Sequence, residues 1–308
     1  MIQRRRILVT GVSGVLGSTL ARTLGDRFDL RGTFYRHPVA LPQTEAIQLD
    51  VTDSRDVLAR IQAIRPEVVI HCAAETRVDW CEENGEQAQA VNVAGTRNLV
   101  EAAERNGAQF VYISTDAVFN GAGGPYAEDA VASPQNVYGR TKLDGEAVVQ
   151  EHASRYLILR TNFFGWGLGS RPTLAEWFLD QLRAGREVPG FVDVVFSPLL
   201  ANDLAGMIGD LIVQDRRGLF HLGSRDWCSK YEFGRLVARA FDLDPDLVKP
   251  ASVVRAGLQA PRAKDTSLNS QKCSQALGSE MPTVADGVAR LRALERAGYR
   301  EIMQAREP

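Results

Sequence analysis

The chain has 308 residues, 44% hydrophobic and 24% charged, which is long enough for one large α/β domain or for a large and a small one. Its formal net charge of -2 gives no electrostatic basis for binding nucleic acid or an acidic membrane. No stretch is long and apolar enough to span a bilayer, so we expect a cytoplasmic protein that acts on a small molecule.

Short apolar runs alternate with longer amphipathic segments through the first half of the chain. The runs predict strands at 6–10, 30–35, 68–70, 110–113 and 156–159. Helices are expected at 14–25, 53–64, 83–106 and 136–152, with Asp53 as an N-cap and Gly107 closing the third. Continuous apolar strands separated by helices indicate right-handed crossovers. The predicted fold class is therefore α/β, a doubly wound parallel sheet of the Rossmann type.

The alternation changes after Arg160. Further helices are expected after Pro172 and at 202–214, 231–241 and 283–296, and the passage at 245–261 is rich in proline. Short strands are expected at 192–196 and 219–222, the second of them returning to the sheet. We therefore divide the chain into a main domain at 1–165 and a smaller substrate-binding lobe at 166–308, with a segment near 200–225 returning to the main domain.

The four cysteines, at 72, 81, 228 and 273, form no CxxC pair and no cluster with zinc-ligand spacing. We therefore expect no metal site. The closeness of Cys72 and Cys81 leaves a disulfide open, whereas reduced thiols are favoured in the cytosol.

Three glycines follow the first strand directly and open the first helix. Gly11, Gly14 and Gly17 have the spacing GxxGxxG. Glycine permits the tight turn and lets backbone N–H groups approach a pyrophosphate, which would sit at the positive end of the helix. The strand–turn–helix context favours dinucleotide binding over a simple packing turn.

The end of the second strand carries no acid to bind a ribose 2′-hydroxyl. Arg36 stands there instead, and we expect it to hold a 2′-phosphate, which predicts NADPH as cofactor with NADH possible. The alternative is that Arg36 is a solvated loop cation. Asp50 is placed to meet the adenine ring, or else to cap the next helix.

A phenol and an ammonium lie one helical turn apart at Tyr138 and Lys142. A nearby cation is expected to lower the pKa of the phenol, so that Tyr138 can exchange a proton with a ketone oxygen. Thr115, at the carboxyl end of the fourth strand, could hydrogen-bond that oxygen. An exposed helix pair is the alternative for Tyr138 and Lys142, and His71 is expected to be a hydrogen-bonded strand-end side chain.

Several motifs together resemble those of the extended short-chain dehydrogenases/reductases. They are GxxGxxG, HCAA at 71–74, VNVAGT at 91–96, STDAVF at 114–119 and YxxxK at 138–142. Within that family the chain is most similar to the dTDP-4-dehydrorhamnose reductases, on STDAVF with Asn120-Gly121 after it, TRVD at 76–79, RTNFF at 160–164 and FSP at 196–198. The resemblance is good to residue 165, looser to about 215, and weak beyond.

The resemblance implies a role for each matching residue. Thr115 would orient the carbonyl, Tyr138 would donate the proton, and Lys142 would bind the nicotinamide ribose and tune Tyr138. The other implied cofactor contacts are Gly14, Val15 and Leu16 on the pyrophosphate, Asp50 and Val51 at the adenine, Ala73 and Ala74 along the channel, and Asn92 near the nicotinamide. The implied substrate contacts are Asp116 and Phe163, the latter at a position where the reductases usually have Trp, which puts the sugar specificity in doubt.

The resemblance leaves three functions open. The first is reduction of the 4-keto group of a nucleotide-linked deoxysugar. The second is another extended-family activity, such as epimerisation; dehydration is disfavoured because Ala117 stands where the dehydratases carry an acid. The third is a non-catalytic regulatory subunit, like that of methionine adenosyltransferase. A homodimer is a possible assembly by analogy with many relatives.

Overall fold

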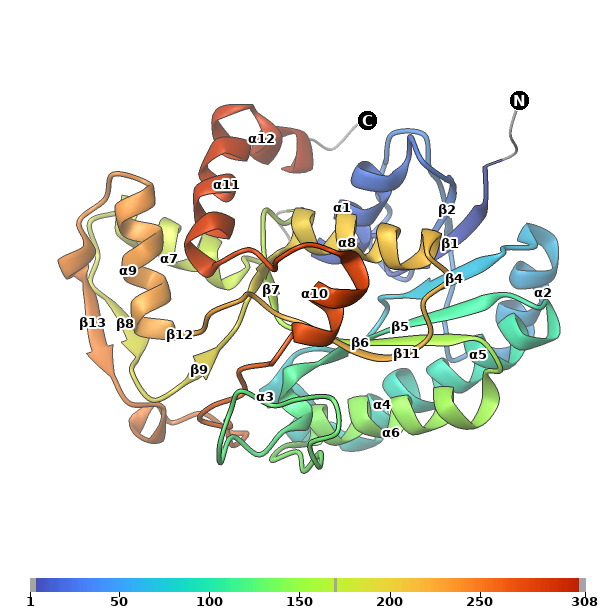
Figure 1. Ribbon diagram of the computed structural model, residues 1–308, viewed down its shortest axis with the longest axis horizontal. Coiled ribbons are helices and arrows are strands. Elements are labelled where there is room, and N and C mark those ends of the chain that lie inside the picture. The colour runs from blue at the N-terminus through green and yellow to red at the C-terminus, as the bar shows by residue number, and fades with distance from the viewer. Residues whose placement is uncertain (1–3, 169–170, 305–308) are drawn as a thin grey trace.

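A computed structural model describes residues 4–168 and 171–304 (Figure 1). Its centre is a seven-stranded sheet in the order β11-β6-β5-β4-β1-β2-β3, in which every pair of neighbours is parallel. In chain order the strands are β1 (Arg6–Thr10), β2 (Asp29–Phe34), β3 (Glu45–Gln48), β4 (Val68–His71), β5 (Gln109–Thr115), β6 (Tyr156–Thr161) and β11 (Gly218–Leu222). The prediction of a doubly wound parallel sheet is confirmed, including the late return of β11.

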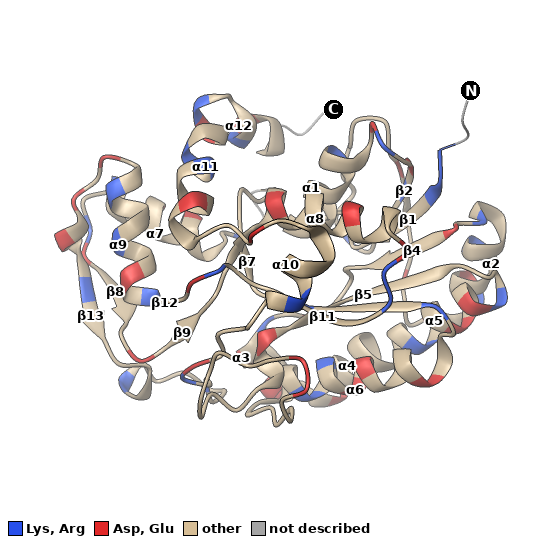
Figure 2. Cartoon of the chain, in the orientation of Figure 1, with Lys and Arg blue, Asp and Glu red and all other residues tan. Residues whose placement is uncertain are grey.

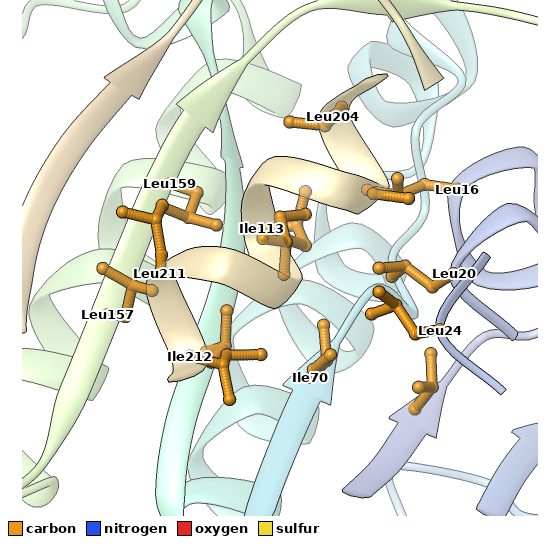
Figure 3. Close-up of a cluster of buried hydrophobic side chains, with 14 of the residues drawn as sticks. Leu16, Leu20, Leu24, Ile70, Ile113, Leu157, Leu159, Leu204, Leu211 and Ile212 are labelled. Carbon is orange, nitrogen blue, oxygen red and sulfur yellow. The ribbon is translucent and has the colours of Figure 1, made fainter. Parts of the chain in front are cut away.

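Helices cover both faces of the sheet (Figure 1). One face packs against α1 (Val15–Leu24) and α8 (Ala201–Val213), and the other against α2 (Ser54–Ile64), α5 (Gly95–Arg105) and α6 (Val137–His152). Alternate strand residues enter the two cores, as Ile7 and Val9 face α1 while Leu8 faces the opposite layer. Figure 3 shows leucines of α1 and α8 meeting over the side chains of β4, β5 and β6. The sheet is therefore buried on both sides, as continuous apolar strands require.

A second hydrophobic cluster lies beside the sheet and is built from α7 (Leu174–Arg183), α9 (Lys230–Ala240) and α11 (Val284–Arg296). Three two-stranded ladders frame it, and they pair β7 (Phe163–Phe164) with β10 (Leu199–Leu200), β9 (Val195–Phe196) with β12 (Cys228–Ser229), and β8 (Val188–Phe191) with β13 (Val248–Ala251). Capping boxes begin all three helices, at Thr173, Ser229 and Thr283. The helices expected at 202–214, 231–241 and 283–296 are confirmed within one residue of each end.

Several elements differ from the sequence-based expectation. The helix expected at 83–106 begins only at Gly85, as α4 (Gly85–Gln89), and passes through a π-helical turn, η1 (Ala90–Ala94), into α5. Asn84 separates it from α3 (Val78–Glu83), because its backbone leaves the helical region there. The expected strand at 192–196 is wrong over 192–194, which form a turn between β8 and β9. Strand β3 was not expected, since its sequence EAIQ has little of the apolar pattern of a buried strand.

Other elements in the C-terminal third also had no counterpart in the prediction, among them β12, β13, α10 (Gln271–Leu277) and α12 (Tyr299–Gln304). Basic and acidic residues are interspersed over the ribbon (Figure 2), in keeping with the small net charge. Among residues 4–168 and 171–304, no helix is long and apolar enough to cross a membrane.

Candidate active site

A cavity of about 600 Å³ lies at the carboxyl ends of β1, β4, β5 and β6, where it is closed on one side by the second cluster. This is the edge at which open α/β sheets bind ligands. The predicted residues that line it are Gly11, Gly14, Val15, Leu16, Gly17, Ala74, Thr115, Asp116, Tyr138, Lys142 and Phe163. The fold therefore brings the glycine turn and the proposed catalytic residues into one space.

The glycine turn leaves the start of α1 open toward the cavity. Gly11 has φ +72°, and a Cβ there would lie 2.8 Å from the backbone nitrogen of Ala73. At Gly17 a Cβ would overlap the carbonyl of Gly11, so the turn can close only with glycine at both positions. Gly14 caps α1 without any side-chain hydrogen bond, and the first N–H groups of the helix remain available to an anion.

Helix α6 places Tyr138 and Lys142 in the cavity wall. Asn136 caps the helix by accepting a hydrogen bond from the Gly139 N–H at 2.9 Å. A Cβ on Gly139 would overlap the carbonyl oxygen of Ala117, so the absence of a side chain lets α6 approach the end of β5 closely. Both Tyr138 and Thr115 then face the same space.

The structure does not show the expected lowering of the pKa of Tyr138 by Lys142. Burial raises the pKa of Tyr138 above its ordinary value, and a hydrogen bond with the Thr115 side chain acts against this rise. Burial also lowers the pKa of Lys142 to about 7, an effect that the Glu146 carboxylate opposes. Desolvation is thus stronger than the attraction between ammonium and phenolate, and the phenol is held in its protonated form.

Thr115 and Asp116 end β5 in a compact hydrogen-bonded turn. The Thr115 hydroxyl accepts a hydrogen bond from the Ala117 N–H and donates one to Asp116, each at 3.1 Å. Asp116 also accepts from Asn162 after β6 and from Thr266 in the C-terminal region, both at 2.9 Å. Burial raises the pKa of the Asp116 carboxyl even so. Asp116 therefore ties the end of β5 to two other walls of the cavity.

Five of the predicted cofactor residues do not line the cavity. Three of them, Arg36, Asp50 and Val51, follow β2 and β3, beyond β1 on the same edge of the sheet. Arg36 is exposed, with its guanidinium 5.0 Å from the centre of the Tyr35 ring. Asp50 accepts hydrogen bonds from Thr52, and Val51 packs where Gly95 has no side chain. The cavity thus spans the proposed pyrophosphate and catalytic positions but not the proposed adenine end.

The other two, Ala73 and Asn92, form hydrogen bonds that hold the chain around the site. The Ala73 N–H donates to the Thr10 hydroxyl at 3.2 Å, beneath the glycine turn. The Asn92 amide is buried and binds both the N–H and the carbonyl of Glu75, as well as the Thr141 hydroxyl. His71, as expected, bonds through both ring nitrogens, to Thr10 and Thr96.

Two cations of the C-terminal half line the cavity near Asp116. Lys230, the first residue of α9, was not predicted, and burial lowers the pKa of its ammonium while Asp116 opposes that change. Arg262 donates to Asp79 of α3 at 2.8 Å and to the Ala260 carbonyl at 2.8 Å. No sequence pattern marks Lys230, because it sits at the junction of a two-residue strand and a helix.

The described part of the chain contains no group of three or more His, Cys, Asp or Glu residues able to hold a metal ion. The side chains of Cys72, Cys81, Cys228 and Cys273 are unpaired thiols. The cavity itself brings the Tyr138 phenol and the Lys142 ammonium into the same space as the start of α1.

Sequence similarity relates this chain to proteins already known. The model of the RmlD substrate-binding domain family matches residues 5–296. The dTDP-4-dehydrorhamnose reductase of Mycolicibacterium smegmatis is 34% identical over 89% of this chain and 81% of its own length. Methionine adenosyltransferase 2 subunit beta of Xenopus laevis is 31% identical over 91% of this chain and 85% of its own.

The fold is also that of a solved structure, dTDP-4-dehydrorhamnose reductase from Bacillus anthracis in complex with NADP. The TM-score is 0.83 at 29% identity, covering 94% of this chain and 99% of the other. The match of the family model over nearly the whole chain settles the classification. This chain belongs to the RmlD substrate-binding domain family.

Proposed function

We propose that the protein is an NADPH-dependent reductase that converts a keto group to a hydroxyl. Its proposed substrate is a nucleotide-linked deoxysugar, of which the 4-keto group is reduced. The observation that carries the proposal is the sharing of one cavity by the glycine turn, Thr115, Tyr138 and Lys142. The reductase of Mycolicibacterium smegmatis and the NADP complex of its Bacillus anthracis counterpart support the substrate class and the cofactor.

The residues around the glycine turn fit a dinucleotide. The N–H groups at the start of α1, at Val15, Leu16 and Gly17, would hold the pyrophosphate, and Lys142 would hold the nicotinamide ribose. NADPH, when bound, supplies a hydride to the carbonyl carbon. Arg36 would bind the 2′-phosphate, with Asp50 and Val51 beside the adenine, Ala73 and Ala74 along the channel, and Asn92 ordering the loop at Glu75 toward the nicotinamide.

Tyr138 is the proposed proton donor. The phenol is protonated at neutral pH, which is the form that an acid for ketone reduction needs, and its raised pKa means that it gives up the proton only to an oxygen that is becoming an alkoxide. Thr115 would hydrogen-bond the carbonyl oxygen and orient it toward the phenol. The oxygen gains its proton from Tyr138 as the carbon gains hydride, so that the ketone becomes an alcohol.

The substrate end of the cavity contains Asp116 and Phe163, which we propose as sugar contacts. Lys230 and Arg262 add positive charge on the same side, which suits an anionic nucleotide portion. Phe163 lacks the indole N–H of the Trp found in many reductases, so the sugar accepted can differ in its hydrogen-bonding groups.

The test is a panel of ketones headed by dTDP-4-keto-6-deoxysugars, with NADPH consumption followed by absorbance. We expect turnover with at least one nucleotide-linked ketone and little with the free sugars. An epimerase would instead interconvert hydroxyl stereoisomers with no net use of NADPH and would retain its nucleotide on purification.

A regulatory role is the second candidate, because the Xenopus laevis relative is a subunit of methionine adenosyltransferase 2. The complete set of Thr115, Tyr138 and Lys142 favours catalysis. Stable co-purification with a methionine adenosyltransferase, together with no turnover of any ketone, would reverse that preference. We further propose a cytoplasmic homodimer, which size-exclusion chromatography with light scattering can check.

A further inference from the structure

A buried ion pair and one hydrogen bond connect three of the elements around the proposed site, β5, β6 and α6. Arg160 of β6 donates to Glu146 of α6 through Nη2 at 2.7 Å and through Nε at 2.9 Å, and their side chains are only 6% and 3% exposed. Ser114 of β5 donates its hydroxyl to the same carboxylate. Because Ser114 precedes Thr115, and Arg160 lies two residues before Asn162, this pair fixes both strand ends relative to α6.

Glu146 also continues a stripe of residues along the inner face of α6. Tyr138, Lys142 and Glu146 are each four residues apart, so they lie one above the other on one face of the helix. The Lys142 ammonium lies 4.0 Å from the centre of the Tyr112 ring beneath it. A Cβ on Gly145 would overlap the Tyr112 hydroxyl, so this glycine lets the stripe approach β5 closely. The ammonium thus lies over an aromatic face, with Glu146 one helical turn further along α6 and opposing the fall in the pKa of Lys142.

The other ionisable neighbours of Lys142 are uncharged near neutral pH. Burial lowers the pKa of His71 to about 3, and it raises the pKa of Cys72 to about 12. Burial also raises the pKa of Tyr112 and of Tyr138 above their ordinary values. The groups whose charge acts on the Lys142 ammonium are Glu146 and Cys72, and of these Glu146 is held in an ion pair with Arg160.

We propose that Glu146, oriented by Arg160, is a positioning residue of the reductase site: its carboxylate acts on the Lys142 ammonium one helical turn away, and its hydrogen bond to Ser114 holds Thr115 against α6. This inference rests on the proposed function. Glu146 does not line the cavity, so it acts only through Lys142 and Ser114.

The test compares the wild-type protein with Glu146→Gln, which keeps the size of the side chain and removes its charge. Lys142 is one of five lysines in the chain, so its signal in a ¹³C-lysine NMR titration can be assigned by its loss in Lys142→Met. We expect the midpoint of Lys142 to fall by about one pH unit in Glu146→Gln, a tenfold rise in acid dissociation constant, because removal of a nearby anion destabilises the ammonium. We also expect kcat to fall about 10- to 100-fold from misplacement of the reacting groups.

If Glu146→Gln fails to fold, a double variant provides the test. Replacing both partners, Glu146→Leu with Arg160→Met, removes the unpaired charge and is expected to restore stability. A positioning role predicts that the double variant folds yet keeps the low Lys142 midpoint and the low kcat. Recovery of wild-type kcat in the double variant, or an unchanged Lys142 midpoint in Glu146→Gln, would overturn the inference.

Glu295→Gln is the matched control. It breaks the pair between Arg183 of α7 and Glu295 of α11, in the second cluster, and should change neither the Lys142 midpoint nor kcat. Failure of the proposed function has a separate signature, because a wild-type protein that reduces no ketone would still give the Lys142 titration.

Discussion

The two ends of the cavity are formed by different kinds of groups, backbone N–H groups at one end and side chains at the other. At the glycine turn, the proposed cofactor contacts are backbone N–H groups of one continuous strand–turn–helix unit. At the Asp116 end, the contacts are side chains contributed by segments far apart in the chain, namely Asp116, Asn162, Lys230, Arg262 and Thr266. We therefore expect binding at the proposed cofactor end to depend on local geometry and binding at the proposed substrate end to depend on tertiary packing, so the two should respond differently to substitution.

The largest effect is expected where the two ends meet, at Tyr138. Tyr138→Phe removes the proposed proton donor and keeps the ring, so kcat/KM for the ketone should fall about 10²- to 10⁴-fold, while the Kd for NADPH stays nearly unchanged. Stopped-flow reduction and a fluorescence titration of NADPH measure the two quantities. Normal turnover by Tyr138→Phe would remove it from the mechanism.

Gly17→Ala should damage the cofactor end alone. The new Cβ would overlap the carbonyl of Gly11, and overpacking of this kind costs about 1–3 kcal/mol of unfolding free energy. We expect a tenfold or greater rise in the Kd for NADPH, roughly the equivalent of 1.4 kcal/mol, and a lower midpoint in urea unfolding.

Gly206→Ala provides the control for that glycine, because a Cβ at Gly206 of α8 would have no atom within 4 Å. It should leave NADPH binding unchanged and stabilise the helix by up to about 1 kcal/mol. Equal loss of NADPH affinity in both variants would show that the glycine turn has no special part in binding.

Arg36→Ala tests the adenine side of the proposed cofactor site. Loss of a charge-assisted hydrogen bond to the 2′-phosphate should weaken NADPH about tenfold and leave NADH unchanged. The ratio of kcat/KM values for the two nucleotides measures this preference. An unchanged ratio would mean that Arg36 is a solvated loop cation.

Thr266→Val should disturb the substrate end alone, and by the smallest amount. It removes one of the hydrogen bonds to the buried Asp116 at a cost of about 1 kcal/mol, so the KM of the ketone should rise several-fold with the Kd of NADPH unchanged. A change in NADPH binding instead would contradict the separation of the two ends.

The same difference between local patterns and tertiary packing explains which features the sequence could predict. Strands such as β1 and β5 are continuous apolar runs, and Asp53 is the N-cap of α2, as predicted. The glycine turn and the 138–142 pair are local patterns, so they were found from the sequence. Lys230 and Thr266 were missed, because only the pairing of β12 with β9 and the path of residues 260–270 bring them to Asp116.

Burial explains why the prediction that Lys142 lowers the pKa of Tyr138 was wrong. The spacing of Tyr138 and Lys142 predicted their shared helix face but not the depth at which they lie. Desolvation raises the pKa of Tyr138 and lowers that of Lys142, so their mutual effect is not the leading one. The break at Asn84, where the backbone leaves the helical region, and the π-helical turn at Ala90–Ala94 are likewise not encoded in a helical period of apolar residues.

The most direct test of the account follows the hydride itself. The wild-type protein is incubated with a dTDP-4-keto-6-deoxysugar and NADPH carrying deuterium at the transferable position of the nicotinamide, and the sugar product is analysed by mass spectrometry and NMR. We predict one deuterium at C4 of the product for each NADPH consumed. An unchanged ketone, or an altered sugar that carries no deuterium, would contradict the proposed reduction.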